Sequence, residues 1–533
     1  MKKEKIENNS KFLTGAFILL IAGVICKFLG AFYRIPLSNI LGAEGIGVYQ
    51  LIFPIYSLFL IVSSGGIPAA LSKSVAECRA RNETSRAKRF VLIAFVLSLF
   101  VSSIFCVIFF VFNNNLAILQ GNIKASLGYL GISVAIVFAS LLTAFRGYFQ
   151  GYQNMMPTAI SQIIEQVGKL VLGLVLAKYF FQFGLEFGVF GALLGISISE
   201  IVALIYLSIA YFRRKKHIDV IEPEIGYKFW GDVWLLVKTS FPITLNSVIL
   251  PLILALDSFL VVKLLLNQGF ANNQATALFG LYSGMVNSLI NFPTVVSLAI
   301  SVSLIPAISY NKQKGGEIEN VVSTCVKIVL LISIPCFLVY VLFSTNIITI
   351  LYPHATNMDN LKVASLLLKL SAINILFISF LQISTSIMQA LSKSFLPLIN
   401  LIIAGCVKIV LIVYLVNSPM NIYGAAIASL VCYAISAGLN LITLKDYCKF
   451  KVGAKPLVTI CLASLVCVSI MVGFYNFFRL FLSLNLSFIF SLIICVFIYL
   501  VGIFMFPVFS EKEIENIPLG KKIKFFGKSL SYK

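Results

Sequence analysis

The segment that decides the fold is FLTGAFILLIAGVICKFLGAFYRIPLSNILG, residues 12–42. It is long enough to cross a bilayer as a helix, since about 20 apolar residues span a hydrocarbon layer of about 30 Å. Two cations, Lys27 and Arg34, interrupt the run, which contains no acidic residue. A charge at membrane depth costs about 2.5–3.5 kcal/mol even on forgiving insertion scales, so such residues usually face a polar cavity or a partner. The segment therefore predicts a membrane-spanning helix with a site that attracts an anion.

The whole chain has the composition of a polytopic membrane protein, because 59% of its 533 residues are hydrophobic and only 11% are charged. Its apolar runs are continuous, which predicts helices and not barrel strands, whose residues alternate. We expect an all-α integral membrane fold with about fourteen transmembrane helices. The predicted spans are residues 12–35, 46–70, 90–112, 126–148, 160–181, 188–210, 238–266, 276–306, 323–345, 363–390, 397–416, 424–444, 457–480 and 487–509.

The net charge of +21 is distributed as the positive-inside rule requires. Connections after even-numbered spans are basic, whereas residues 182–187, 267–275 and 417–423 contain no Lys or Arg. This alternation argues against nucleic-acid binding and predicts a multi-pass protein of the cell membrane with both termini in the cytoplasm. The basic loops are suited to anionic lipid headgroups.

The chain has few of the residue types and motifs that catalytic and metal-binding sites use. Its eleven cysteines form no CxxC pair, and it has only two histidines, His217 and His354. It also lacks a GxxxxGK[ST] phosphate loop. We therefore expect no catalytic residues, no metal, no cofactor and no nucleotide, with the membrane potential or an ion gradient as the energy source.

An internal repeat relates residues 1–210 to residues 238–445. Residues 47–54 (GVYQLIFP) match residues 280–287 (GLYSGMVN), and residues 149–172 match residues 388–411, pairing Lys169 with Lys408. Chance similarity between apolar segments is the alternative. An even number of spans per half predicts a parallel repeat, with two six-helix lobes about a pseudo-twofold axis along the membrane normal. The predicted parts are an N-lobe (1–215), a C-lobe (216–445), an extra helix pair (446–510) and a basic cytoplasmic tail (511–533).

Two sequence blocks carry a family resemblance: KFLGAFYRIPLSNILGAEGIGVYQLIFPIYSLFLIVSSGGIPAALSK (27–73) and RGYFQGYQNMMPTAISQIIEQVGKLVLG (146–173). With the fourteen-span plan, they resemble the polysaccharide-transport branch of the multidrug/oligosaccharidyl-lipid/polysaccharide superfamily, and within it the stage V sporulation protein B and lipid II flippase group. The resemblance implies a two-lobe transporter with alternating access and a cavity that holds arginines on the first, second and eighth spans. Here Lys27 matches a basic position of that family, Arg34 falls one place from the next, and spans 46–70 and 276–306 have no basic residue.

Lys27 and Arg34 are seven residues apart and so share one stripe of a helix, with the small residues Gly30 and Ala31 between them. We expect both cations to bind substrate, with room for a ligand beside the small residues. For Lys27 the alternative is pairing with an acid of another span, and for Arg34 it is anchoring at the membrane interface. Pro36 predicts a break or kink just beyond Arg34.

Other charges within the spans extend the predicted site. Arg146, Lys169 and Lys408 are further substrate-binding candidates, although topology alone would explain Arg146 at the end of its span. Glu165 precedes Lys169 by four residues, which first predicts an ion pair on one helix, with a proton or cargo role as the alternative. Glu165, Glu200 and Asp257 are the candidates for coupling or counter-ion groups.

The predicted function is a flippase that moves a lipid-linked, pyrophosphate-bearing cell-wall precursor, with lipid II as the expected cargo, from the inner to the outer leaflet. Arg and Lys suit such cargo because they neutralise phosphate. The expected partners are this lipid-linked oligosaccharide and membrane lipids, and the cell-wall synthesis machinery is a candidate. The alternatives are a cation-coupled multidrug exporter, a membrane glycosyltransferase or polymerase, and a scaffold without transport.

Overall fold

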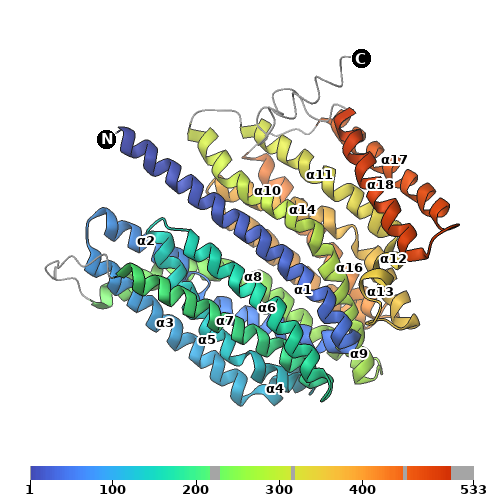
Figure 1. Cartoon of the computed structure of the whole chain (residues 1–533), viewed down its shortest axis with the longest axis horizontal. Coiled ribbons are helices and arrows are strands. Elements are labelled where there is room, and N and C mark those ends of the chain that lie inside the picture. Colours follow the sequence, from blue (N-terminus) through green and yellow to red (C-terminus); the bar gives the residue numbers. More distant parts are fainter. Residues whose placement is uncertain (1, 216–228, 314–317, 448–452, 506–533) are drawn as a thin grey trace. The chain divides into compact units, whose positions relative to one another are not determined.

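The computed structural model describes residues 2–215, 229–313, 318–447 and 453–505, and all of the regular structure in them is helical (Figure 1). The predicted basic tail, residues 511–533, and His217 lie outside this part of the chain. An all-helical fold follows from the composition, because a backbone in lipid has to satisfy its own hydrogen bonds and helices do so within one segment. The predicted all-α membrane fold is confirmed.

The chain divides into two compact units, one of residues 1–285 with 411–422 and one of residues 286–410 with 423–533. The predicted division into lobes remains a prediction. The first unit contains α1 (Lys2–Ser64), α2 (Ile67–Ala80), α3 (Thr84–Val111), α4 (Asn113–Leu119), α5 (Ala125–Gly151), α6 (Met156–Phe181), α7 (Leu185–Lys215), α8 (Phe229–Asn267), α9 (Asn272–Phe279) and nearly all of the π-helix η1 (Gly280–Val286).

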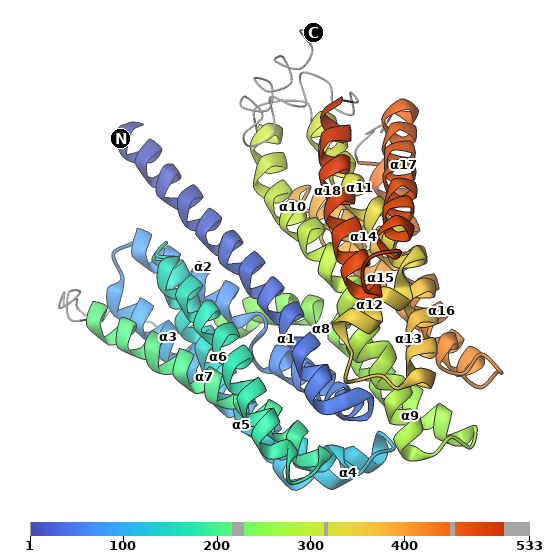
Figure 2. The ribbon, with the colours of Figure 1, turned by 45° about the vertical axis from the view of Figure 1, so that its right-hand side comes forward.

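The second unit is built from the later helices. They are α10 (Asn287–Gln313), α11 (Ile318–Leu342), α12 (Ser344–Leu351), α13 (Met358–Ser371), α14 (Asn374–Ala390), most of α15 (Phe395–Val416), α16 (Ile422–Lys445), α17 (Ala454–Phe478) and α18 (Leu484–Met505). In this unit α10 packs against α11 and α14, and α17 lies beside α18 (Figure 2). Ser379 on α14 accepts hydrogen bonds from Ser297 of α10 at 2.9 Å and Ser333 of α11 at 3.1 Å, so small hydroxyls tie these helices together.

Helix α1 contains the first predicted span and most of the second in one run of 63 residues. It would be about 95 Å long if straight, about three times the thickness of the hydrocarbon layer. The run is broken at Gly42, whose φ of 72° and ψ of 179° are not helical. The expected break just beyond Arg34 is therefore wrong in position, because the helix continues through Pro36 and turns at the residue without a Cβ.

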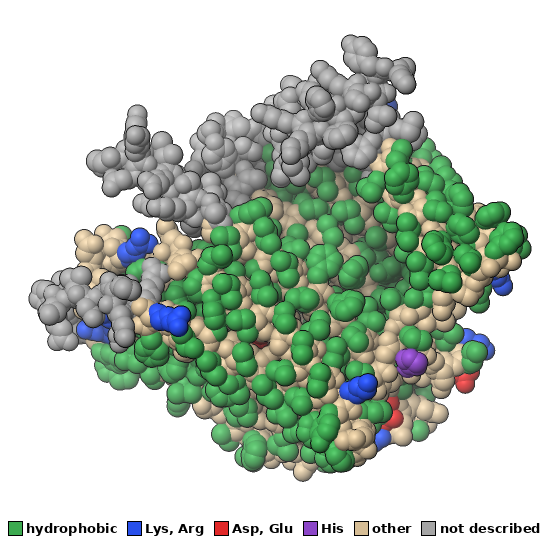
Figure 3. Space-filling model, in the orientation of Figure 1, with side chains coloured by type: hydrophobic (Ala, Val, Ile, Leu, Met, Phe, Trp, Pro, Cys, Tyr) green, Lys and Arg blue, Asp and Glu red, His purple; other side chains and the backbone are tan. Residues whose placement is uncertain are grey.

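The number of spans is not confirmed as fourteen. Among the described residues, twelve helices are long and apolar enough to cross a membrane, or up to thirteen if the bent pair α13 and α14 forms one span. One of the twelve runs from Phe17 to Ala80 and includes most of the first predicted span and all of the second. The face seen in Figure 3 is covered mostly by hydrophobic side chains, as a surface in contact with lipid tails requires. The protein is a multi-pass membrane protein.

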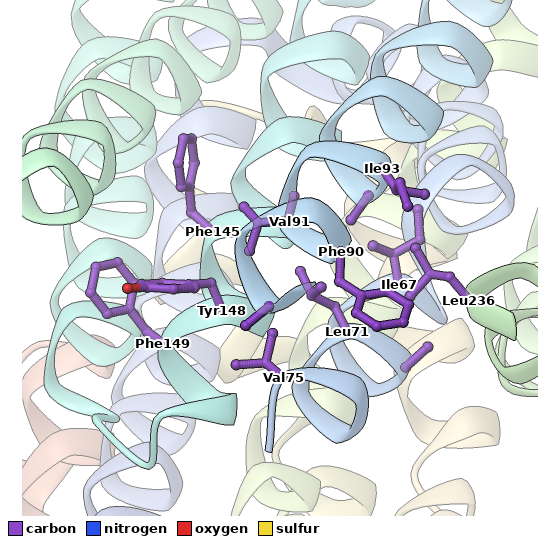
Figure 4. Close-up of a cluster of buried hydrophobic side chains, with 14 of the residues drawn as sticks. Ile67, Leu71, Val75, Phe90, Val91, Ile93, Phe145, Tyr148, Phe149 and Leu236 are labelled. Carbon is purple, nitrogen blue, oxygen red and sulfur yellow. The ribbon is translucent and has the colours of Figure 1, made fainter. Parts of the chain in front are cut away.

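Apolar packing in the first unit joins α2, α3, α5, α7 and α8 (Figure 4). Phe90 on α3, Leu71 on α2 and Phe149 on α5 are each buried to within 1% of full burial. Between α6 and α7, small residues bring the backbones together, since a Cβ added at Gly195 would lie 2.5 Å from the Cα atom of Gly173. This close approach fixes the relative positions of the side chains that α6 and α7 carry.

The repeat-related glycines Gly47 and Gly280 pack against each other within the first unit. A Cβ on Gly47 would lie 2.1 Å from the carbonyl oxygen of Thr276, and a Cβ on Gly280 would lie 2.1 Å from that of Ala43. Gly280 begins η1, where the wider backbone ladder leaves carbonyl groups in need of donors. Gln50 supplies one, because its Nε2 donates to the Ser283 carbonyl at 2.6 Å.

We predict that Gly47→Ala destabilises the protein by about 1–3 kcal/mol, because the added methyl group overlaps backbone atoms that cannot move aside without disturbing η1. Gly438→Ala in α16 is the matched control, since a Cβ there meets nothing within 4 Å. Thermal denaturation in detergent, followed by size-exclusion chromatography, compares the two. The midpoint should fall for Gly47→Ala and stay level or rise for Gly438→Ala, and equal midpoints would contradict this packing.

Candidate functional site

The two cations of the first predicted span lie on the part of α1 that precedes Gly42. Lys27 is exposed and forms no ion pair with any described residue, so the alternative of pairing with an acid of another span is not observed among them. Arg34 is partly buried, and its Cζ atom lies 5.9 Å from the centroid of the Phe53 ring. A Cβ added at Gly30 would lie 3.5 Å from Oε1 of Gln166 on α6, an ordinary contact distance.

Lys169 on α6 lies near Phe53 as well, and also near Tyr33. Its Nζ atom lies 4.6 Å from the centroid of Phe53 and 5.5 Å from that of Tyr33. A cation over a ring face is stabilised by about 0.5–2 kcal/mol, depending on desolvation. Arg34 and Lys169 thus share the Phe53 ring, although they come from different helices. Tyr33 is 1% exposed and packs so closely on α6 that a Cβ at Gly173 would lie 2.7 Å from its hydroxyl oxygen.

The expected ion pair between Glu165 and Lys169 is wrong, because Glu165 pairs with α5 instead. Arg146 of α5 donates from Nη2 to Glu165 Oε2 at 2.8 Å and from Nε to Ser161 Oγ at 3.1 Å. Gln166 donates to Glu165 Oε1 at 3.1 Å. An arginine fork offers this carboxylate better geometry than a lysine on its own helix. Lys169 is thereby left without a carboxylate partner within 4.0 Å among the described residues.

Glu200 on α7 is buried, with 4% of its surface exposed. Its Oε2 atom has no hydrogen-bond partner in the described part of the chain. Arg146, Glu165 and Lys169 all lie within range of electrostatic interaction with it. The small-residue contact between α6 and α7 brings this acid to the cations, since a Cβ at Gly168 would lie 2.8 Å from the Cβ atom of Ser199.

Six predicted site residues are therefore brought together in the first unit, and we call them the charge cluster. Its members come from α1, α5, α6 and α7: Lys27, Arg34, Arg146, Glu165, Lys169 and Glu200. The cluster has four cations and two carboxyl groups. Arg146 and Glu165 form an ion pair within it, whereas Lys27 and Lys169 form none with a described residue. Such an arrangement is suited to binding an anion, because cations remain that no protein carboxylate neutralises.

Asp257 and Lys408 do not join this cluster. Asp257 is buried on α8, where neighbouring Ser258 accepts a hydrogen bond at 3.0 Å from Gln120. Lys408 is 3% exposed on α15 and belongs to the second unit, although the repeat relates it to Lys169. The roles expected for both residues stay predictions.

The sequence did not reveal the aromatic side chains or the charges that position α8. Tyr33 and Phe53 are two of 21 tyrosines and 46 phenylalanines, and no spacing distinguishes them. At the start of α3, Arg86 donates to Asp232 of α8 at 2.8 Å and to Glu83 at 3.1 Å, and Arg89 lies 3.7 Å from Asp232. Arg86 and Arg89 fit the positive-inside pattern, so their sequence positions did not indicate that they bind α8 to α3.

A family model described as polysaccharide biosynthesis protein matches residues 12–312, more than half of the chain. The chain belongs to this family. The matched region contains most of α1 and all of the charge cluster, so this polysaccharide biosynthesis family member carries its cluster in the region that the family model matches.

Individual relatives agree with that assignment. This family member is 27% identical to stage V sporulation protein B of Bacillus subtilis (strain 168) over 439 residues, which cover 81% of this chain and 82% of the relative. It is 26% identical to lipid II flippase MurJ of the same organism over 465 residues, covering 82% and 83%. A solved structure of lipid II flippase MurJ in an inward closed conformation aligns with a TM-score of 0.68 and 16% identity, covering 91% of this chain and 98% of the other. The predicted resemblance is confirmed, and the chain has a transporter fold.

We predict that Arg146→Gln and Glu165→Gln each lower the free energy of unfolding by about 1–3 kcal/mol, because each leaves a partly buried partner unsatisfied. The double variant should lose less than the sum of the two, since two neutral amides can bond each other. Chemical denaturation in detergent measures the difference.

The exposed pair Lys73 and Glu77, 4.0 Å apart, is the control for this double-mutant cycle. Its coupling should be about 0.5 kcal/mol or less, because water screens surface ion pairs. Equal coupling for the two pairs would contradict a special role of Arg146 and Glu165.

Proposed function

We propose that this protein is a flippase that moves a lipid-linked, pyrophosphate-bearing cell-wall precursor, with lipid II as the cargo, from the inner to the outer leaflet. The observation that carries the proposal is the excess of cations in the charge cluster, where neither Lys27 nor Lys169 forms an ion pair with a described residue. A diphosphate headgroup supplies the missing negative charge, and Arg and Lys are the side chains that bind it.

Three of these cations are the proposed contacts for one ligand. Lys27 and Arg34 lie two helical turns apart on α1, and Lys169 reaches Phe53 from α6, as Arg34 does from its own helix. Lys169 also interacts electrostatically with both α1 cations. In our proposal Lys27, Arg34 and Lys169 contact the phosphates, and Arg146 holds Glu165 away from them. Lys408 and Asp257 stay further candidates for contact and coupling in this scheme.

Relatives support this choice of cargo. The name lipid II flippase belongs to a relative that shares 26% identity over most of both chains. We propose that this chain shares that relative's cargo, and that the membrane lipids around it house the prenyl tail throughout the cycle. The cell-wall synthesis machinery is the proposed partner that consumes the product.

The proposed energy source is electrical. With the cell interior negative, each negative charge that moves outward gains about 2.3 kcal/mol per 100 mV, so export needs no nucleotide. We further propose that the protein is not an enzyme, has no cofactor, and holds both termini in the cytoplasm. Flipping leaves every covalent bond of the cargo intact, so it requires residues that bind the cargo and no catalytic residues.

A cation-coupled multidrug exporter is the second candidate, favoured by the buried carboxyl group of Glu200. A cationic drug would need a site with more carboxylates than cations, because like charges repel. The charge cluster has the opposite balance, with four cations and two carboxyl groups.

We predict that Lys169→Ala and Lys27→Ala each slow outward movement of a fluorescent lipid-linked muropeptide in reconstituted vesicles by about tenfold or more. A charge-assisted contact is worth about 1.5–3 kcal/mol, which corresponds to that factor. Lys178→Ala is the matched control, because Lys178 lies exposed in the last turn of α6 and outside the cluster.

An imposed potential, inside negative, should speed outward movement by the wild-type protein. Export of a cationic dye by the wild-type protein, with no movement of the muropeptide, would instead establish the multidrug exporter. Equal rates for Lys169→Ala, Lys27→Ala and Lys178→Ala would remove the charge cluster from the mechanism.

A further inference from the structure

The cluster contains one group that cargo binding alone does not use, the carboxyl group of Glu200. It is 96% buried, since 4% of its surface is exposed, and its Oε2 atom has no hydrogen-bond partner in the described residues. A buried carboxylate without full hydrogen bonding is costly, and it either keeps compensating charge nearby or accepts a proton. The state of Glu200 therefore depends on the charges around it.

Each helix packed against α7 contributes to those surroundings, and α7 itself has no other charged residue between Glu186 and Arg213. Within electrostatic range of Glu200 are Arg146 of α5, Glu165 and Lys169 of α6, and the Tyr56 hydroxyl of α1. Arg146 is already bonded to Glu165 at 2.8 Å. The cation still available to balance Glu200 is therefore Lys169, which is also in range of Lys27 and Arg34.

The charge of Lys169 can thus interact with two groups, the carboxyl group of Glu200 and the diphosphate of the proposed cargo. With both carboxyl groups ionised, the six residues of the cluster have a net charge of two positive, and with Glu200 neutral they have three. An anion that occupies Lys27, Arg34 and Lys169 adds negative charge near Glu200 and offsets the charge that stabilised its carboxylate. Repulsion between like charges then favours the neutral acid.

We propose that Glu200 takes up one proton when a diphosphate anion binds to the cluster, so that cargo binding and proton binding are linked. The inference rests on the proposed function. The proton comes from solvent and binds Oε2, the atom without a hydrogen-bond partner, and no bond of the cargo forms or breaks. Glu200 is here a positioning residue, since it acts on the anion through Lys169.

The sign of the linkage follows from the count of protons. The complex holds more protons than the free protein, so raising the pH weakens binding, by up to about tenfold per pH unit while Glu200 titrates. Glu200→Gln keeps the shape of the side chain and fixes it in the neutral state. This variant should bind the anion at least as tightly as the wild type, and it should lose the share of the pH dependence that Glu200 contributes.

The test is isothermal titration calorimetry of the full-length protein with farnesyl diphosphate, in two buffers of different ionisation enthalpy. The difference between buffers counts the protons exchanged on binding. The ligand also exchanges protons on binding, since the second pKa of a phosphate group is about 6. This contribution is the same for every variant, so comparison with Glu200→Gln isolates the protein's share. Glu186→Gln, in the first turn of the same helix, is the matched control.

Wild type and Glu186→Gln should each take up about half to one proton more than Glu200→Gln, which would support the inference. Equal uptake by all three, with binding intact, would overturn the linkage and leave the proposed function standing. Absence of binding by the wild type across the pH range would overturn both.

A second measurement needs no variant and so does not depend on the folding of Glu200→Gln. Infrared difference spectra of the wild-type protein, with and without farnesyl diphosphate, should gain the carbonyl stretch of a protonated carboxylic acid. A spectrum without this band would overturn the inference even if the anion binds.

Discussion

Charge imbalance in a layer of low dielectric is the constraint on which the rest of this structure depends. Four cations from α1, α5 and α6 lie in one cluster with two carboxyl groups, and the hydrogen bond from Arg146 to Glu165 joins α5 to α6 at 2.8 Å. By engaging Glu165, Arg146 leaves Lys169 to the rings of Tyr33 and Phe53. Aromatic faces stabilise a cation without neutralising it, so its charge stays available to a ligand.

Close helix packing holds these charges at their distances. Lipid offers little hydrophobic drive for helices to associate, so backbones approach through small residues, as Gly173 and Gly195 do between α6 and α7. The same device joins Gly47 to the segment that begins at Gly280, where Gln50 donates to a carbonyl of the π-helix. A π-helix is rare and is frequently found at functional sites, and here it begins at a repeat-related contact.

Composition and hydropathy were sufficient to predict the helical membrane fold and most span positions, because every long apolar run has to satisfy its backbone within itself. Six of the eight predicted site residues also meet in one cluster, since intramembrane charges are rare enough to stand out. The partners of these charges could not be predicted. Glu165 and Lys169 are neighbours on one helix, yet Arg146 takes Glu165 from another, and only the tertiary packing of α5 on α6 decides this. Likewise Pro36 is the stronger breaker by sequence, but α1 turns at Gly42, where a positive φ is needed.

The proposed linkage between proton and cargo would change the energetics of the export proposed above. An anion with about two negative charges gains about 4.6 kcal/mol per 100 mV on moving outward, at 2.3 kcal/mol for each charge. A proton carried along on Glu200 halves that gain, so the potential drives the cycle less strongly than the charge of the cargo suggests. If the proton instead leaves Glu200 while the cluster still faces the cytoplasm, the full gain is kept, and proton release weakens the hold on the anion. The side from which Glu200 exchanges its proton therefore sets the charge moved per cycle, and with it the dependence of export on the membrane potential.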